Sequence, residues 1–386
     1  MKLSLGIIGV GNMGAGHIAN ALAGRMPEIE IVAVADLKAE RREWAQQTLG
    51  ESVRIYEDGS DLIQADDCDA VLIAVPHYDH PRYAIEALGR DKHVMVEKPA
   101  GVYTKAVREM NEYAATKDKV FAMMFNQRTN PLYREIHDLV HGGSLGEIKR
   151  VNWLITDWYR PQSYYNSGQW RATWAGEGGG VLLNQCPHNL DLLQWICGLP
   201  VRVRAFVHEG KWHDIEVEDD VTAYLEFENG ATGTFITSTA DAPGTNRLEI
   251  QMDGGRLVAE HGKLTLDKLA VGEREWNSRE HVNVFAQPPV ENLVIETPGE
   301  NLQHVGVLNA FAAAVLRGEA LIAAGEEGIN GLMLSNAMHL SAWTDQMVTL
   351  PIDEDLYLSL LNERRANSCL KDTVDRTMDV AGTYGS

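Results

Sequence analysis

Three glycines near the N-terminus have the spacing of a dinucleotide-binding turn. They follow an apolar strand pattern, open a helical pattern and fit G-x-G-x-x-G within the run Gly9, Val10, Gly11, Asn12, Met13, Gly14. Such glycines let the backbone approach a pyrophosphate, and the N–H groups at the helix start face its oxygens. Asp36 ends the next predicted strand, where a carboxylate accepts the ribose hydroxyls and repels a 2′-phosphate. The pattern predicts an NAD site and favours NAD over NADP, although Arg41 and Arg42 lie nearby.

A lysine and a histidine in later segments could carry acid–base chemistry. Lys98 follows a predicted parallel strand, at the edge where α/β sheets bind ligands, and its ammonium can stabilise a developing alkoxide. His188 has a side chain that titrates near neutral pH, and we take it as the proton acceptor. A helix over about 184–196 would place Asn184, His188 and Asp191 on one face. A cation and an imidazole of this kind could bind a substrate oxygen and accept its proton.

The irregular segment Asp157–Trp174 is rich in aromatic side chains and contains Arg160 and Arg171. Apolar faces of sugars stack on aromatic rings, and their hydroxyls pair with polar side chains, so the segment suits a carbohydrate pocket. The alternative is a loop whose aromatic residues are simply buried. The predicted substrate contacts are Tyr164, Tyr165, Trp170 and Arg171.

The elements that must position these residues divide the chain in two. Apolar runs and helical patterns alternate over residues 1–125, which predicts a parallel sheet in an NAD-binding domain. Residues 126–360 read as an α+β domain with a mostly antiparallel sheet, and residues 361–386 as a loosely held polar tail. Two further helices are expected at about Val305–Leu316 and Gly328–Thr344.

Composition excludes several function classes. The chain has 386 residues and a formal net charge of −21, which argues against nucleic acid or an anionic membrane as partner. No apolar run reaches the roughly 18 residues of a membrane span. The four cysteines form no CxxC pair and no metal-ligand spacing, so we expect no metal site, no disulfide framework and a cytoplasmic location.

Three segments resemble the Gfo/Idh/MocA oxidoreductase family. They are PHYDHPRYAIEALGRDKHVMVEKP from Pro76, GGGVLLNQCPHNLDLLQWICG from Gly178, and the C-terminal run LNAFAAAVLRGEALIAAGEEGINGLMLSNAMHLSAW. The resemblance implies an N-terminal Rossmann domain that holds NAD and a second domain with a large open sheet that carries substrate and subunit contacts. It implies a homodimer or homotetramer that oxidises a secondary alcohol of a sugar, glycoside or inositol.

The same resemblance assigns individual residues. Pro76 and His80 match the cofactor-side element, and Glu97 matches a residue near the nicotinamide ribose. The family often has Asp four residues before the histidine, where this chain has Asn184. An amide can orient a substrate hydroxyl but carries no proton at neutral pH, so Lys98 and His188 must divide the work.

Several readings stay open at this stage. Asp191 either fixes the tautomer of His188, lies on the helix surface or pairs with a neighbouring strand, and His304 is expected to border the pocket. Two other functions share the motifs: an enzyme that recycles its NAD internally, such as a redox-assisted glycosidase or epimerase, and a dinucleotide-binding regulator without catalysis. The regulator ranks last because both Lys98 and His188 are present.

Overall fold

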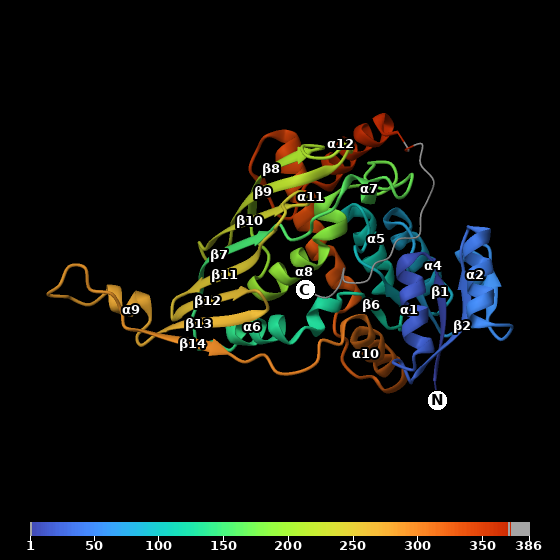
Figure 1. The fold of residues 1–386 in the computed structure, drawn as a ribbon, viewed down its shortest axis with the longest axis horizontal. Coiled ribbons are helices and arrows are strands. Elements are labelled where there is room, and N and C mark those ends of the chain that lie inside the picture. Colours follow the sequence, from blue (N-terminus) through green and yellow to red (C-terminus); the bar gives the residue numbers. More distant parts are fainter. Residues whose placement is uncertain (1, 370, 372–386) are drawn as a thin grey trace.

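A parallel sheet forms the N-terminal part of the computed structural model, which describes residues 2–369 and 371 (Figure 1). Its six strands run in the order β3-β2-β1-β4-β5-β6. They are β1 (Leu3–Ile8), β2 (Ile29–Ala35), β3 (Arg54–Tyr56), β4 (Ala70–Ile73), β5 (His93–Val96) and β6 (Phe121–Met123). The central strand β4 is fully buried, as its continuous apolar sequence predicts for a sheet covered on both faces. The predicted fold class is confirmed.

Helices connect and flank these strands. They are α1 (Asn12–Leu22), α2 (Ala39–Leu49), α3 (Gly59–Gln64), α4 (His80–Gly89) and α5 (Thr104–Ala114), with the 3₁₀ turn η1 (His77–Asp79) before α4. The short helix α3 was missing from the sequence prediction because its six residues are too few to show a helical period. Its start is fixed by Asp58, whose carboxylate accepts the N–H of Ser60 at 2.7 Å.

The parallel register brings three functional segments to one edge. Ile8 of β1 pairs with Ile73 of β4, and Ile73 pairs with Val96 of β5. The residues that follow these strand ends, including Gly9 and Lys98, therefore meet at the carboxyl edge of the sheet, where ligands of α/β proteins bind.

The second sheet has nine strands in the order β14-β13-β12-β11-β7-β10-β9-β8-β15. Its pairs are antiparallel apart from β7 with β10. The strands are β7 (Ile148–Ile155), β8 (Arg202–Glu209), β9 (Glu218–Glu226), β10 (Thr232–Ser238), β11 (Asn246–Met252), β12 (Gly255–Glu260), β13 (Lys263–Leu269), β14 (Val290–Ile295) and β15 (Val348–Thr349). The mostly antiparallel sheet of the sequence prediction is confirmed, and β13 and β14 extend it.

The remaining helices are spread over the second half of the chain, from the space between the two sheets to the far end of the antiparallel sheet (Figure 1). They are α6 (Pro131–His141), α7 (Gln162–Tyr165), α8 (Pro187–Cys197), α9 (Glu273–Asn277), α10 (Gln303–Arg317), α11 (Gly328–Thr344) and α12 (Glu354–Asn367), with short turns η2 (Asn126–Thr129), η3 (Val181–Gln185) and η4 (Gly325–Glu327). Helices α8 and α11 contact each other, and α11 also contacts β8 and α5. Within residues 2–369 and 371, no helix combines the length and the apolar character that a membrane crossing requires.

Two C-terminal helices depart from the simple division of the chain. Helix α10 returns to the parallel sheet, where Leu308 and Phe311 join the core formed around β1. Helix α12 occupies part of the region that we expected to be a loose tail from residue 361, and it buries Tyr357 and Leu361. Only two residues of α12 are buried, which explains its weak apolar pattern. Residues 370 and 372–386 of the expected tail lie outside the described part of the chain.

Candidate active site

The glycine turn between β1 and α1 has the shape that a dinucleotide requires. A Cβ atom on Gly14 would lie 2.0 Å from the carbonyl oxygen of Gly9, so only glycine allows this close contact of helix and turn. A Cβ on Gly11 would meet no atom within 4 Å, which leaves open space above the turn. Gly11 also precedes α1 without a side-chain cap, so the positive end of this helix remains available to phosphate oxygens. These residues fit a bound NAD.

Asp36 lies at the end of β2 and ties this strand to the glycine turn. Its Oδ2 accepts the N–H of Val10 at 2.8 Å, and its Oδ1 accepts the N–H of Lys38 at 2.9 Å. The two neighbouring arginines bind backbone carbonyls: Arg41 Nε donates to Val10 at 2.7 Å, and Arg42 Nη1 donates to Asp36 at 2.8 Å. The carboxylate is thus held at the place where the sequence predicts contact with the ribose.

The carboxylate of Glu97 is buried at the end of β5 and pairs with a histidine of α1. Glu97 Oε1 lies 2.7 Å from His17 Nε2. Burial alone would raise the pKa of Glu97, but the hydrogen bond and charge of His17 outweigh it and lower the pKa to about 2. His304, at the start of α10, has its ring 5.5 Å from that of His17, and burial lowers its pKa to about 4. Glu97, His17 and His304 form a buried group beside the cofactor turn.

Lys98 reaches from the parallel sheet to the second half of the chain. Its Nζ donates to the backbone carbonyl of Asn184 at 3.0 Å. Burial lowers the pKa of Lys98, while the carboxylates of Glu97 and Glu177 counteract this. This contact joins the end of β5 to the glycine-rich segment before α8.

His188 lies in the first turn of α8 and is buried. Neither Nδ1 nor Nε2 of its ring has a hydrogen-bond partner among residues 2–369 and 371. Burial, together with the positive charge of Lys98, holds the pKa of His188 well below its ordinary value. A buried polar group without a partner costs about 1–3 kcal/mol, so this unsatisfied ring points to a ligand that would bind it.

The loop before α8 does not follow the predicted helix. Asn184 belongs to the π-helical turn η3, which ends at Gln185, and α8 starts afresh at Pro187. Proline lacks an N–H group and favours the first position of a helix, so it separates the two elements. The prediction that Asn184, His188 and Asp191 share one helix face was therefore wrong.

Asp191 pairs with Arg128 and not with His188. Its carboxylate accepts two hydrogen bonds from Arg128, at 2.9 Å to Oδ2 and 2.6 Å to Oδ1. Arg128 also binds Glu327 at 2.6 Å, so one buried guanidinium links α8 to the end of η4. The suggestion that Asp191 fixes the tautomer of His188 is not supported, and it is neither a surface acid nor a partner of a strand.

Pro76 and His80 shape the loops beside the cofactor turn. Pro76 follows β4 and precedes η1. His80 Nδ1 lies 2.7 Å from the carbonyl oxygen of Pro99, and its Nε2 lies 2.8 Å from that of Val75. His80 thus connects the chain after β4 to the chain after Lys98, and both of its ring nitrogens face backbone oxygens.

The aromatic segment presents one tyrosine to the site and buries its neighbour. The hydroxyl of Tyr164 accepts from Arg171 Nη1 at 2.7 Å and from Asn184 Nδ2 at 3.0 Å. The guanidinium of Arg171 also lies over the rings of Tyr164 and Trp170, with distances of 4.5 and 4.6 Å to the ring centroids. The structure therefore brings Tyr164, Trp170, Arg171 and Asn184 together, and their contact with substrate stays a prediction.

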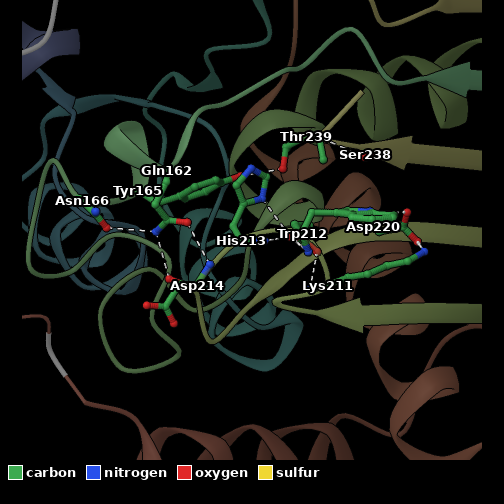
Figure 2. A network of polar contacts seen from close by, with 12 residues as sticks. Gln162, Tyr165, Asn166, Lys211, Trp212, His213, Asp214, Asp220, Ser238 and Thr239 are labelled. Carbon is green, nitrogen blue, oxygen red and sulfur yellow. Dashed lines mark hydrogen bonds and ion pairs between the residues drawn. The ribbon is translucent and has the colours of Figure 1, made fainter. Parts of the chain in front are cut away.

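Tyr165 is buried and anchors the segment to the second sheet and to the loop before β9 (Figure 2). Its hydroxyl donates to Thr239 Oγ1 at 2.7 Å, and its ring lies 4.8 Å from that of His213. Gln162 adds hydrogen bonds to Asp214 in the loop before β9, with Asp214 N–H donating to Gln162 Oε1 at 2.9 Å. The hydroxyl of Tyr165 is thus bound within the fold, and its ring lies 5.2 Å from that of Tyr164. Contact of Tyr165 with substrate stays a prediction.

Sequence reasoning missed two buried residues that contact the predicted site. His17 lies one turn after Gly14 on α1, and its only signal was a histidine among apolar helix residues. Glu177 precedes the glycines of the second motif, and its side chain binds Asn184 Nδ2 at 2.6 Å. A single acid between an aromatic segment and three glycines was its only signal, and its partners depend on the tertiary fold.

Comparison with known proteins agrees with this geometry. Residues 3–125 match a family model described as the oxidoreductase family, NAD-binding Rossmann fold, and residues 133–258 match the GFO/IDH/MocA C-terminal domain. A myo-inositol 2-dehydrogenase of Thermotoga maritima is 24% identical over 356 residues, which cover 90% of this chain and 98% of the relative.

Solved structures give the same fold. The WlbA dehydrogenase of Bordetella pertussis, in complex with NADH and UDP-GlcNAcA, is 25% identical with a TM-score of 0.76, over 92% of this chain and 100% of that chain. A levoglucosan dehydrogenase with NADH has a TM-score of 0.75 at 21% identity, over 91% of this chain and 100% of that chain. The two family models together span more than half of the 386 residues, and they include both the cofactor turn and His188. The chain belongs to the Gfo/Idh/MocA family of NAD-binding oxidoreductases.

Proposed function

We propose that this protein is an NAD-dependent dehydrogenase that oxidises a secondary alcohol of a sugar, glycoside or inositol. The observation that carries the proposal is the buried ring of His188, whose two nitrogens lack partners among the described residues while the charge of Lys98 acts on it. A substrate hydroxyl placed there would satisfy the ring and lie at the carboxyl edge of the parallel sheet, near the cofactor turn.

The residues divide the work of moving one proton. A bound nicotinamide supplies the acceptor for the hydride that leaves the carbinol carbon. Lys98 donates a hydrogen bond to the substrate oxygen and stabilises the negative charge that develops on it. His188 is neutral at neutral pH because its pKa is held low, so its free nitrogen can accept the hydroxyl proton.

Two observations support the proposed substrate class: the side chains gathered around Tyr164 and the activities named for relatives. Tyr164, Trp170 and Arg171 offer aromatic faces and hydrogen-bonding groups, a combination that suits a pyranose or cyclitol ring. The named activity of the inositol dehydrogenase relative supports the same class.

A screen of NAD reduction, followed by absorbance at 340 nm, tests the proposal. Inositols, free sugars and glycosides are offered in turn with NAD, and the proposal expects net formation of NADH with at least one of them. A glycoside that is cleaved or epimerised without net NADH would instead indicate that the cofactor is recycled within the site. No turnover of any polyol, with NADH still bound tightly, would contradict the proposal in favour of a regulator.

A further inference from the structure

Glu177 is a buried carboxylate that the proposed chemistry does not use. Its Oε1 accepts a hydrogen bond from Asn184 Nδ2 at 2.6 Å, and its Oε2 accepts the N–H of Ala172 at 2.6 Å. Arg171 Nη1 lies 3.5 Å from Oε1. The side chain of Glu177 is 1% exposed, and this burial raises its pKa, while the charge of Arg171 and the hydrogen bond from Ala172 counteract the rise.

Asn184 connects this carboxylate to Lys98. The backbone carbonyl of Asn184 accepts the Lys98 ammonium at 3.0 Å, and its side-chain amide donates to Glu177. An ionised carboxylate only accepts hydrogen bonds, so the amide must turn its Nδ2 toward Glu177. The amide oxygen of Asn184 then remains to accept a hydrogen bond from a ligand.

We propose that Glu177 is a positioning residue that supplies, through Asn184, the negative charge that an aspartate at position 184 would bring to Lys98. The family motif would place the carboxylate at position 184, whereas here the carboxylate of Glu177 binds the amide of Asn184. This contact orients the amide toward substrate. This inference rests on the proposed function, since it assumes that Lys98 and Asn184 face the reacting alcohol. In this proposal Glu177 acts through Asn184 and not by direct contact with the reacting groups.

The charges around Lys98 make the effect of Glu177 measurable. Loss of its carboxylate removes one of the two negative charges that support the lysine ammonium. The charged and titratable groups that act on Lys98 are Glu97, Glu177, Arg160, Arg171, His77, His188 and His304. Most of the other groups are cations or neutral imidazoles, so they do not replace the lost charge.

A charge swap between positions 177 and 184 separates this role from loop support. In Glu177→Gln, the oxygen of the new amide can still accept the N–H of Ala172. Its NH₂ group then faces Nδ2 of Asn184, so two donors meet and this hydrogen bond is lost. We expect kcat to fall at least about 10-fold, the factor that loss of one hydrogen bond to a charged group produces. In the double variant Glu177→Gln with Asn184→Asp, the amide at position 177 donates to a carboxylate at position 184. We expect this variant to recover most of the lost kcat.

A second readout does not depend on turnover. The folded protein is treated with an acylating reagent at a series of pH values. Mass spectrometry of its peptides then gives the rate at which Lys98 reacts at each pH. Glu177→Gln should shift this profile to lower pH, and the double variant should shift it back toward wild type. Asp214→Asn removes an exposed carboxylate near the same loop and should change neither kcat nor the profile.

The outcomes distinguish the possible failures. An unchanged Lys98 profile and unchanged kcat in a folded Glu177→Gln protein would overturn the inference. A fall in kcat that the double variant does not rescue, with no shift of the profile, would also overturn it and leave Glu177 as loop support. If the wild-type protein reduces no NAD with any polyol, the proposed function fails, while the Lys98 profile still decides whether Glu177 acts on that lysine.

Discussion

The glycine turn that holds the dinucleotide and the group of residues around His188 are built in opposite ways. The turn comes from one strand–turn–helix, and its acidic partner Asp36 has both carboxylate oxygens bound to backbone N–H groups. The group around His188 consists of Lys98 after β5, Asn184 of η3 and His188 of α8, and the imidazole has no hydrogen-bond partner among the described residues. One region is complete before any ligand binds, whereas the other requires a ligand to satisfy it.

This difference separates binding from chemistry. The glycine turn, the start of α1 and Asp36 recognise the pyrophosphate and the ribose, which every NAD molecule has. Their positions can therefore be fixed before NAD binds. Lys98 and His188 must instead interact with an oxygen whose charge changes during the reaction, and groups of perturbed pKa suit that task. Substitutions in the two regions should therefore affect different measured quantities.

The largest effect is expected in the reaction centre. Lys98→Ala and His188→Ala should each lower kcat at least about 100-fold, because a general base or a stabiliser of the alkoxide commonly contributes that much. The dissociation constant of NADH, measured by fluorescence titration, should change little in His188→Ala. Lys105→Ala, which removes a lysine paired with Asp355 at 2.7 Å on the surface, serves as the matched control. A turnover close to wild type in either variant would remove that residue from the mechanism.

A smaller effect, on affinity, is expected in the cofactor cradle. Asp36→Ala removes a carboxylate that binds Val10 and Lys38 and is placed to accept the ribose hydroxyls. We expect the KM for NAD to rise about 10-fold, and the preference for NAD over NADP to weaken because the repulsion of a 2′-phosphate is lost. Steady-state kinetics with both cofactors checks this. If kcat at saturating NAD falls as far as in His188→Ala, the proposed separation of the two regions does not hold.

The smallest effect concerns stability against pH at the border of the two regions. The pKa of His304 is lowered from 6.5 to about 4, so between these values the unfolded chain binds a proton that the folded protein does not. Stability therefore falls as the pH decreases from about 6.5 toward 4. For this one residue we expect a loss of about 2 kcal/mol between pH 7 and pH 5.

Urea unfolding at pH 7 and pH 5 measures this loss. His304→Gln should show a smaller decrease in unfolding free energy than the wild-type protein, although His188 and His77 contribute in the same direction in both proteins. An equal decrease in variant and wild type would show that His304 is not buried as a neutral ring.

The same contrast explains what the sequence could predict. Gly9 to Gly14 and Asp36 belong to neighbouring elements, so their spacing along the chain reflects their spacing in space. Asn184 was assigned to the wrong element because the effect of Pro187 on a continuous apolar pattern was overlooked. Glu177 could not be assigned because its partners, Asn184 and the field of Lys98, are set by tertiary packing. Helix α12 shows the same limit, since only Tyr357 and Leu361 mark its buried side.

The most direct test is a crystal structure of the protein with NADH and a polyol that it turns over. The account predicts that Lys98 Nζ and the imidazole of His188 contact one hydroxyl, whose carbon lies about 3–3.5 Å from C4 of the nicotinamide. A nicotinamide bound in a different place, or a structure in which the two side chains open into separate cavities, would contradict it.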